Sequence, residues 1–331
     1  MTARQTAVVT GGAGFIGSHM VDLLLERGYK VRVIDNLSCG REPNLAQHAR
    51  NPDIVFERRH IQDIKDDDSL FAGARLVFHF AGIGDIVPSI ERPTDYISSN
   101  VMGTVRVLEA ARRAEVGGLV YAASSSCYGL ADVPTNENHP IDPRYPYALS
   151  KNLGEQAVFH WHQVYKLPVN SIRIFNAYGP RVRTTGAYGA VFGVFLRQKL
   201  AREPFTVVGD GTQRRDFVYV TDVADAFLRA AETSVRGEIF NLGNGDPQSI
   251  NRLVELLGGE VVSVPERPGE PDCTWADISK IQSVLGWRPT VPFDEGVGRM
   301  LECIEDWWDA PLWTPKNISE ATRLWHTHLS S

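Results

Sequence analysis

The stretch that decides the fold is TAVVTGGAGFIGSH, residues 6–19. Its first five residues favour a strand and the residues after Gly17 favour a helix, with Gly11 and Gly14 in the turn between them. Glycines permit the tight turn and let a pyrophosphate approach the backbone, while the helix start offers free N–H groups. The turn predicts a dinucleotide site, although its G-x-x-G-x-x-G spacing differs from the commoner G-x-G-x-x-G.

Short apolar segments alternate with longer amphipathic ones through the first half of the chain. The apolar segments have the composition of strands and lie at 6–10, 30–34, 54–57, 75–80, 118–123 and 169–175. Helix-like segments lie between them, at 16–27, 101–113 and 148–165. Because the strands are apolar on nearly every residue, helices must cover both faces of their sheet, which is typical of parallel sheets. We predict an α/β fold with a Rossmann-type, doubly wound parallel sheet.

The alternation breaks after about residue 176. A glycine-rich loop (179–193) follows, then a short βαβ-like return and helices separated by proline and glycine. We expect residues 1–175 to form the dinucleotide-binding domain, which also receives about 217–242. Residues 176–216 and 243–331 are then expected to form a smaller C-terminal α/β domain that binds the substrate.

The C-terminal tail is rich in tryptophan. Trp307, Trp308, Trp313 and Trp325 lie in it, and a helical face is shared by Ile318, Ala321, Leu324 and Trp325. A cofactor contact is one interpretation of these rings. We expect instead that they close the core by packing, because large aromatic side chains usually do so.

Composition excludes several classes of partner. The 331 residues carry a net charge of -6 and no basic tail, which argues against nucleic acid and anionic membranes. No apolar run approaches the roughly 20 residues that span a bilayer. Four cysteines without a C-x-x-C pair predict neither a metal site nor a disulfide framework; they are Cys39, Cys127, Cys273 and Cys303. We expect a cytoplasmic protein with reduced thiols.

An acidic residue selects the dinucleotide. Asp35 ends the second predicted strand, eighteen residues after Gly17, where a carboxylate accepts both ribose hydroxyls and repels a 2′-phosphate. NAD is therefore favoured over NADP. Asp63 and Ile64, after the third strand, are placed to meet the adenine, although an ordinary loop aspartate explains Asp63 equally well.

Three residues further along suggest chemistry. Tyr147 and Lys151 are four apart at the start of a predicted helix, so they share a face. An ammonium beside a phenol lowers the phenol's pKa and makes it a usable acid or base. Ser124 ends a strand, at the sheet edge where open α/β sheets bind ligands. A tyrosine and a lysine at this spacing are common on helix surfaces, and only this context favours catalysis.

The motifs together resemble the extended short-chain dehydrogenase/reductases that modify nucleotide sugars, the NAD-dependent epimerase/dehydratase family, and most closely its UDP-glucose 4-epimerase branch. The resemblance covers about residues 6–300. Its motifs are TGGAGFIGSH (10–19), DNLSCG (35–40), HFAG (79–82), AASSSCYG (122–129), YPYALSK (145–151), IFNAYGPR (174–181), GDGTQRRDFVYVTDVADA (209–226) and RPGEPDCTWADISK (267–280).

The resemblance implies roles for matching positions. Implied NAD contacts are Gly11, Gly14, Phe15, Ile16, Gly17, Asp35, Asn36, Asp63, Ile64, Phe80, Ala81, Gly82, Asn100, Tyr147 and Lys151. The implied catalytic triad is Ser124, Tyr147 and Lys151. Implied substrate contacts are Ser124, Ser125, Ser126, Tyr147, Asn176, Arg215, Arg267 and Glu270, of which Asn176, Arg215 and Arg267 hold the diphosphate and Glu270 suits the ribose. As isolated residues, the two arginines would be read as surface ion-pair partners.

The two residues after Ser124 narrow the choice of reaction. Dehydratases of this family have acidic residues where Ser125 and Ser126 lie, and decarboxylases have a glutamate at the position of Ser126. The expected activity is therefore a nucleotide-sugar 4-epimerase acting on UDP-hexoses or their N-acetyl forms with bound NAD. The alternatives are a UDP-glucuronate 4-epimerase, a decarboxylase, a dehydratase, a reductase and a non-catalytic NAD sensor.

The sugar and the assembly are less determined by sequence. Thr274 replaces a bulky tyrosine found in members restricted to simple hexoses, which leaves space for an N-acetyl group, or it is mere filler. Arg181 and Arg183 either meet a uronate carboxylate or face solvent. Relatives pair two helices across a dimer, here around 94–113 and 148–165, so a homodimer is expected.

Overall fold

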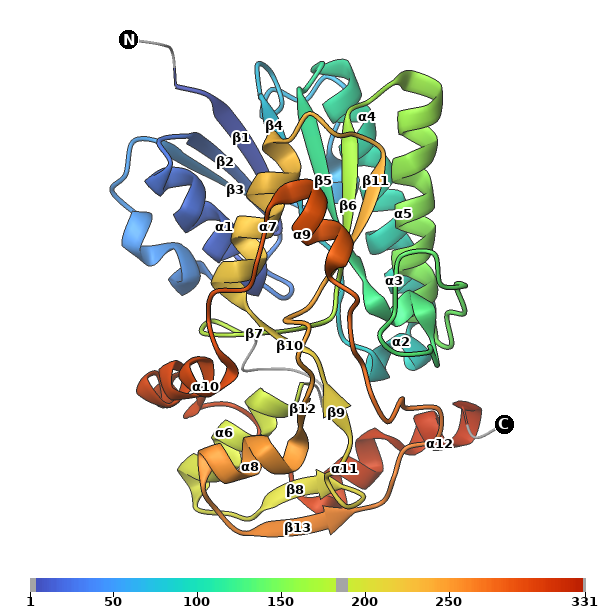
Figure 1. Cartoon of the computed structure of the whole chain (residues 1–331). Coiled ribbons are helices and arrows are strands. Elements are labelled where there is room, and N and C mark those ends of the chain that lie inside the picture. Colours follow the sequence, from blue (N-terminus) through green and yellow to red (C-terminus); the bar gives the residue numbers. More distant parts are fainter. Residues whose placement is uncertain (1–3, 183–189, 330–331) are drawn as a thin grey trace.

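The computed structural model describes residues 4–182 and 190–329. Its larger part is built on a parallel seven-stranded sheet (Figure 1). The strand order across the sheet is β11-β6-β5-β4-β1-β2-β3. The strands are β1 (Thr6–Thr10), β2 (Lys30–Asp35), β3 (Ile54–Arg58), β4 (Leu76–His79), β5 (Gly118–Ser124), β6 (Val169–Ile174) and β11 (Glu238–Leu242). This order reverses direction at β1 and β4, which confirms the predicted doubly wound Rossmann-type sheet.

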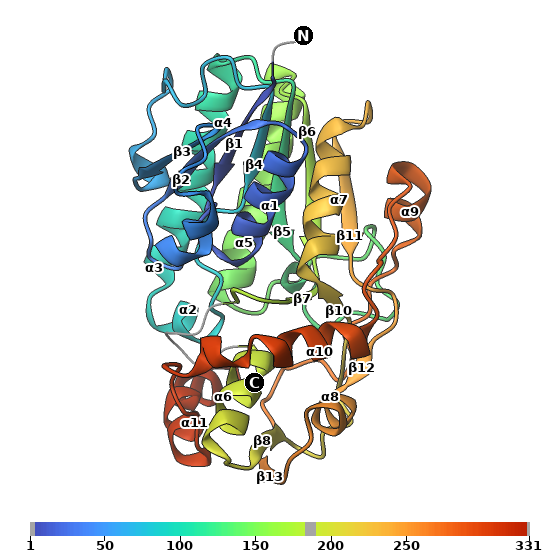
Figure 2. The same cartoon turned by 90° about the vertical axis from the view of Figure 1, so that its left-hand side faces the viewer.

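Helices cover both faces of the sheet, as Figure 2 shows from the side. One face packs on α1 (Phe15–Glu26), α7 (Val220–Glu232) and α9 (Ser279–Leu285). The other packs on α4 (Gly103–Arg113) and α5 (Pro146–Tyr165).

Successive strand residues point to opposite layers and explain the two-sided apolar pattern. Val9 and Val120 pack with α1 and α7, whereas Val8 and Leu119 pack with α4 and α5. All four side chains are buried. Because each strand buries both faces, its sequence has apolar residues nearly throughout rather than at alternate positions.

A smaller lobe follows the carboxyl ends of the strands (Figures 1 and 2). Its aromatic core contains Tyr178, Phe192, Phe217 and Phe293. The elements between and around the two lobes are β7 (Asn176–Tyr178), α6 (Val191–Ala201), β8 (Phe205–Val208), β9 (Arg214–Arg215), β10 (Phe217–Tyr219), β12 (Gln248–Ser249), α8 (Ile250–Leu257), β13 (Val261–Val264) and α10 (Phe293–Glu302).

Short helices carry the chain beside the cleft. These are α2 (Val87–Glu91), α3 (Pro93–Tyr96) and a π-helical turn (Ile97–Met102) that leads into α4. The tail ends in α11 (Pro315–Ala321) and α12 (Arg323–Leu329). Within the described residues, no helix combines the length and apolar character that a membrane span requires.

The tail tryptophans differ from one another in burial. Trp307 and Trp325 are buried, as expected for rings that pack, whereas Trp308 is 64% exposed. The apolar face predicted over 318–325 is divided by a break at Thr322, whose hydroxyl donates to the Ile318 carbonyl at 2.8 Å.

Candidate active site

The glycine turn joins β1 to α1 and is fixed by backbone packing. Gly11 has φ of +72° and donates its N–H to the Ile34 carbonyl at 2.7 Å. A Cβ atom at Gly11 would lie 2.6 Å from the Ala81 nitrogen, and one at Gly17 would lie 2.1 Å from the Gly11 carbonyl oxygen. Side chains are therefore excluded, and α1 begins without a side-chain cap on its N–H groups. This is a cradle suited to a pyrophosphate.

Asp35 ends β2 beside this turn and is 6% exposed. Its carboxylate accepts the Ala13 N–H at 3.0 Å and the Leu37 N–H at 2.8 Å. Burial raises the pKa of Asp35 above its usual value, while these backbone hydrogen bonds act in the opposite direction. The carboxylate thus lies beside the turn, where a ribose could use its remaining acceptor capacity.

A single cavity of about 690 Å³ brings both predicted sites together. This volume lies within the range of small-molecule sites, roughly 300–1,000 Å³. Most predicted site residues line it: Gly11, Gly14, Phe15, Ile16, Gly17, Asp35, Asn36, Phe80, Ala81, Gly82, Ser124, Ser125, Ser126, Tyr147, Lys151, Asn176, Arg215, Arg267, Glu270 and Thr274. The glycine turn and the tyrosine therefore open onto one space.

Three predicted NAD contacts do not line this cavity. Ile64 is 2% exposed within the core, and Asp63 stands next to it; Ile61 and Gln62 line the cavity instead. Asn100 is buried, and its amide exchanges hydrogen bonds with the Ile83 backbone at 2.7 and 3.0 Å. Asn100 therefore holds the loop after β4, which itself borders the cavity.

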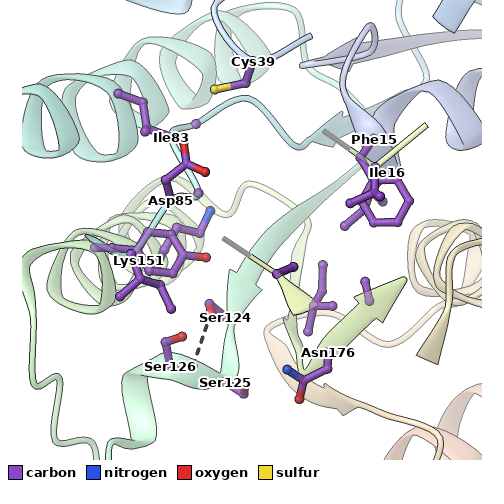
Figure 3. Close-up of a pocket in the computed structure, with 18 of the residues that line it drawn as sticks. Phe15, Ile16, Cys39, Ile83, Asp85, Ser124, Ser125, Ser126, Lys151 and Asn176 are labelled. Atoms are coloured by element: carbon purple, nitrogen blue, oxygen red, sulfur yellow. Dashed lines mark hydrogen bonds between the residues drawn. The ribbon is translucent and has the colours of Figure 1, made fainter. Parts of the chain in front are cut away.

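The tyrosine, lysine and serine converge as the spacing predicts. Tyr147 lies in the first turn of α5 and Lys151 one turn later, while Ser124 ends β5 and hydrogen-bonds the Tyr147 phenol. Figure 3 shows Lys151 and Ser124 directed into the same space. The Lys151 ammonium also lies 4.5 Å from the centre of the Tyr121 ring.

The expectation that the pKa of Tyr147 is lowered is wrong for this structure. Burial raises the pKa of Tyr147 rather than lowering it, and only the hydrogen bond from Ser124 acts in the opposite direction. Burial also lowers the pKa of Lys151 to about 8, since desolvation disfavours an ammonium. The sequence shows the four-residue spacing but does not reveal the depth at which both groups are buried.

Neutral hydroxyls follow Ser124. The turn Ser125–Tyr128 begins where Ser124 Oγ accepts the Ser126 N–H at 3.2 Å, the dashed line in Figure 3. The Ser126 hydroxyl in turn hydrogen-bonds Tyr145. These positions can bind hydroxyls, but they offer no carboxylic acid for elimination.

Two arginines share one carboxylate on the smaller lobe. Arg215 donates to Glu270 Oε1 at 2.9 Å, and Arg267 lies 2.7 Å from Glu270 Oε2. All three line the cavity. Two positive charges against one negative charge leave a net charge of +1, which suits a bound diphosphate.

Thr274 and Asn176 form the floor near these arginines. The Thr274 hydroxyl donates to Asn176 Oδ1 at 2.8 Å, and the Thr274 N–H donates to the Arg214 carbonyl at 3.0 Å. Thr274 is thus not mere filler, because it orients the Asn176 amide. Its short side chain leaves cavity volume in front of it.

Arg181 is not directed at the cavity. Its guanidinium pairs with Asp22 of α1 at 2.7 Å, and it is absent from the residues that line the cavity. The interpretation of Arg181 as a partner for a uronate carboxylate is therefore not supported by its position. Arg183 lies outside the described residues.

Several lining residues were not predicted as site residues, among them Asp85, Tyr145 and Trp325. Asp85 follows the HFAG motif, and Tyr145 stands two residues before Tyr147, so both had a positional signal. Trp325 had none, because the tail reaches the cavity only in three dimensions. In the part of the chain that the structure describes, no group of three or more His, Cys, Asp and Glu side chains is arranged to hold a metal ion.

Comparison with known proteins agrees with this geometry. The model of the NAD-dependent epimerase/dehydratase family matches residues 7–243. A UDP-glucose 4-epimerase of Mycolicibacterium smegmatis is 36% identical over 306 residues, covering 89% of this chain and 97% of that protein.

Two solved structures are similar over nearly their full length. UDP-glucose 4-epimerase from Thermotoga maritima, solved with UDP-glucose, has a TM-score of 0.85 at 33% identity and covers 91% of this chain and 99% of its own. UDP-glucuronic acid 4-epimerase from Bacillus cereus, in complex with UDP-glucuronic acid and NAD, has a TM-score of 0.85 at 30% identity with the same coverage.

The fold and the cavity thus define a Rossmann-type, dinucleotide-dependent protein. The chain belongs to the NAD-dependent epimerase/dehydratase family. The predicted cofactor, NAD, is confirmed by this membership and by the NAD-containing relative.

Proposed function

We propose that this chain is a UDP-sugar 4-epimerase acting on UDP-hexoses, UDP-glucose and UDP-galactose or their N-acetyl forms. The observation that carries the proposal is the hydrogen-bonded Ser124–Tyr147 pair, with Lys151 one turn away, in the same cavity as the Arg215–Glu270–Arg267 cluster. A proton-transfer group and a diphosphate site open onto one space.

The protein's own residues would move the proton. Tyr147, as phenolate, takes the proton of the sugar 4-hydroxyl, and Ser124 hydrogen-bonds the same oxygen. Because burial disfavours the phenolate, positive charge nearby is required, and Lys151 would supply it. Lys151 would also hold the ribose hydroxyls of a bound NAD.

NAD, when bound, would supply hydride transfer to and from the sugar's C4 carbon. Between the two transfers, Arg215 and Arg267 anchor the diphosphate while the 4-keto sugar turns over. Binding energy at this remote group retains the intermediate during reorientation. The neutral Ser125 and Ser126 give no acid for dehydration or decarboxylation.

UDP-glucuronate is the alternative substrate. The Bacillus cereus relative is a UDP-glucuronic acid 4-epimerase, and serine hydroxyls at 125 and 126 can hydrogen-bond a carboxylate. Against this, Arg181 is engaged by Asp22. We therefore place UDP-hexoses first.

The test supplies the purified protein, without added NAD, with UDP-glucose, UDP-N-acetylglucosamine and UDP-glucuronate separately. We expect NMR to show conversion of a UDP-hexose to its 4-epimer, with no net change in reduced-cofactor absorbance. Release of carbon dioxide from UDP-glucuronate would indicate a decarboxylase. Accumulation of a dehydrated or reduced sugar would indicate a dehydratase or reductase. NAD binding without conversion of any of the three would indicate a sensor.

We also propose a homodimer through α4 and α5. Apolar side chains are exposed on or next to these helices: Met102, Leu149, Val164 and Tyr165 are 54%, 40%, 52% and 48% exposed. Association would bury them. Sedimentation at several concentrations tests this, and a monomer at all of them would overturn it.

A further inference from the structure

The tail helix α12 reaches the catalytic cleft from the far end of the chain. Trp325 of α12 is 5% exposed and lines the main cavity. The helix packs against α2, which belongs to the loop region after β4. Its predecessor α11 packs in the core of the smaller lobe through Ile318. The tail therefore connects the two sides of the cleft.

Trp325 contacts elements from both sides at once. Its indole N–H donates to the Pro268 carbonyl at 2.8 Å, inside the turn that carries Arg267 and Glu270. Its ring lies 5.6 Å from the ring of Tyr145. One side chain thus touches Tyr145, which precedes α5, and the turn 267–270, called the diphosphate turn below.

Tyr145 connects Trp325 to Tyr147, the proposed proton-transfer group. It stacks on Tyr147 with ring centres 6.5 Å apart and planes 8° from parallel. Burial raises the pKa of Tyr145 to about 12, and its phenol hydrogen-bonds Ser126. Tyr145 is therefore a neutral, fixed ring between Trp325 and the tyrosine that transfers the proton.

Trp325 also borders two cavities. A second cavity of about 200 Å³ shares four lining residues with the first: Arg144, Tyr145, Gly269 and Trp325. The second cavity is further lined by His328 and Leu329 of α12. Removing the indole would enlarge both spaces and give the substrate room to shift.

We propose that Trp325 is a positioning residue for the substrate: it fixes Tyr145 behind Tyr147, holds the diphosphate turn, and forms part of the cleft wall on the side of the second cavity. This rests on the proposed function for its kinetic effects. The ligand concerned is the sugar-diphosphate part of a UDP-sugar, and the expected consequence of this wall is that the 4-keto sugar stays bound between the two hydride transfers.

The experiment compares Trp325→Ala and Trp325→Phe with Trp308→Ala, a matched change at a 64% exposed tail tryptophan. Two measurements are made on each NAD-loaded variant. The first is UDP affinity by calorimetry, which needs no turnover. The second is steady-state kinetics with the best UDP-sugar, with reduced-cofactor absorbance followed during the reaction. Thermal unfolding and NAD content are recorded for all.

For Trp325→Ala we expect UDP affinity to fall at least tenfold, KM to rise more than kcat falls, and reduced cofactor to accumulate as keto sugar escapes. Trp325→Phe keeps the ring against Tyr145 but loses the donor to Pro268. It should lose part of the UDP affinity while keeping kcat and accumulating little reduced cofactor. Trp308→Ala should match wild type.

The inference would be overturned if both Trp325 variants bound UDP as tightly as Trp308→Ala does. It would also be overturned if Trp325→Ala lowered kcat while its KM stayed unchanged and no reduced cofactor accumulated. If Trp325→Ala yields too little folded protein, UDP affinity in Trp325→Phe decides. A wild type that converts no UDP-sugar would refute the proposed function, while the affinity comparison would still decide the role of Trp325.

Discussion

The two ends of the cleft are constructed differently. At the cofactor end, backbone atoms lie so close that side chains are excluded: a Cβ at Gly11 or Gly17 would clash with neighbouring backbone. At the sugar end, side chains from distant elements meet, as Thr274 does with Asn176 and Trp325 with Tyr145. Substitutions should therefore alter cofactor binding at one end and substrate choice at the other, and a substitution of Tyr147 between them should stop both half-reactions.

The largest effect is expected where the two ends meet. Tyr147→Phe removes the proton-transfer group without changing the ring packed beside Tyr145. Epimerisation should fall by about 10²- to 10⁴-fold, the usual contribution of a general acid or base, while NAD stays bound. Turnover and NAD released on denaturation measure this. Tyr165→Phe, on the exposed end of α5, is the control, and near-normal epimerisation by the Tyr147 variant would refute the assignment.

A change confined to the sugar end should alter selectivity alone. Thr274→Tyr fills the space in front of Asn176, so kcat/KM for UDP-N-acetylglucosamine relative to UDP-glucose should fall by about 10- to 200-fold, as for an overfilled pocket. Thr274→Ser keeps the hydroxyl that donates to Asn176 and should change little. An unchanged ratio in the tyrosine variant would mean that Thr274 does not border the sugar.

A change confined to the cofactor end should weaken NAD binding and have little effect on the choice of sugar. Asp35→Asn removes the negative charge beside the ribose, and hydrogen bonds to charged groups contribute about 1.5–3 kcal/mol. We expect the NAD dissociation constant to rise roughly tenfold or more, measured by calorimetry on cofactor-free protein. Equal affinity, with an unchanged preference against NADP, would contradict the role of Asp35.

The smallest effect concerns pH. Burial lowers the pKa of Lys151 to about 8, so Lys151 is cationic below that pH and neutral above it. The active form pairs the Tyr147 phenolate with the Lys151 cation, so it has lost one proton. Because the pKa of Tyr147 lies above that of Lys151, the population of this form grows with pH up to about 8 and then levels off, and kcat/KM should do the same. Residual activity of Lys151→Arg should keep rising above about pH 8, since arginine stays charged. A wild-type kcat/KM that declines as pH rises through about 8 would exclude this role.

The difference between the two ends also explains what the sequence could predict. Backbone-determined features leave local patterns, so the strands, the glycine turn and the position of Asp35 follow from residue type and spacing. The four-residue spacing of Tyr147 and Lys151 predicted their shared face. It did not predict the direction of the Tyr147 pKa, because burial depends on elements packed over α5.

Features formed by distant side chains were harder to predict. Arg181 pairs with Asp22 of α1, a contact that no local pattern indicates. Trp325 was grouped with core tryptophans, and it is buried, but its neighbours are Tyr145 and the diphosphate turn. Thr274 was singled out as a sugar-facing candidate only because a family resemblance marked its position, and it lines the cavity.

The most direct test of the central claim follows a label at the sugar's C4 carbon. UDP-glucose deuterated at C4 is incubated with the purified protein, without added NAD, until the epimer accumulates. If hydride leaves and returns within one closed cleft, the 4-epimer retains the deuterium at C4, and none appears in solvent. Loss of the label to water, or a 4-epimer that carries hydrogen in place of deuterium at C4, would contradict the account.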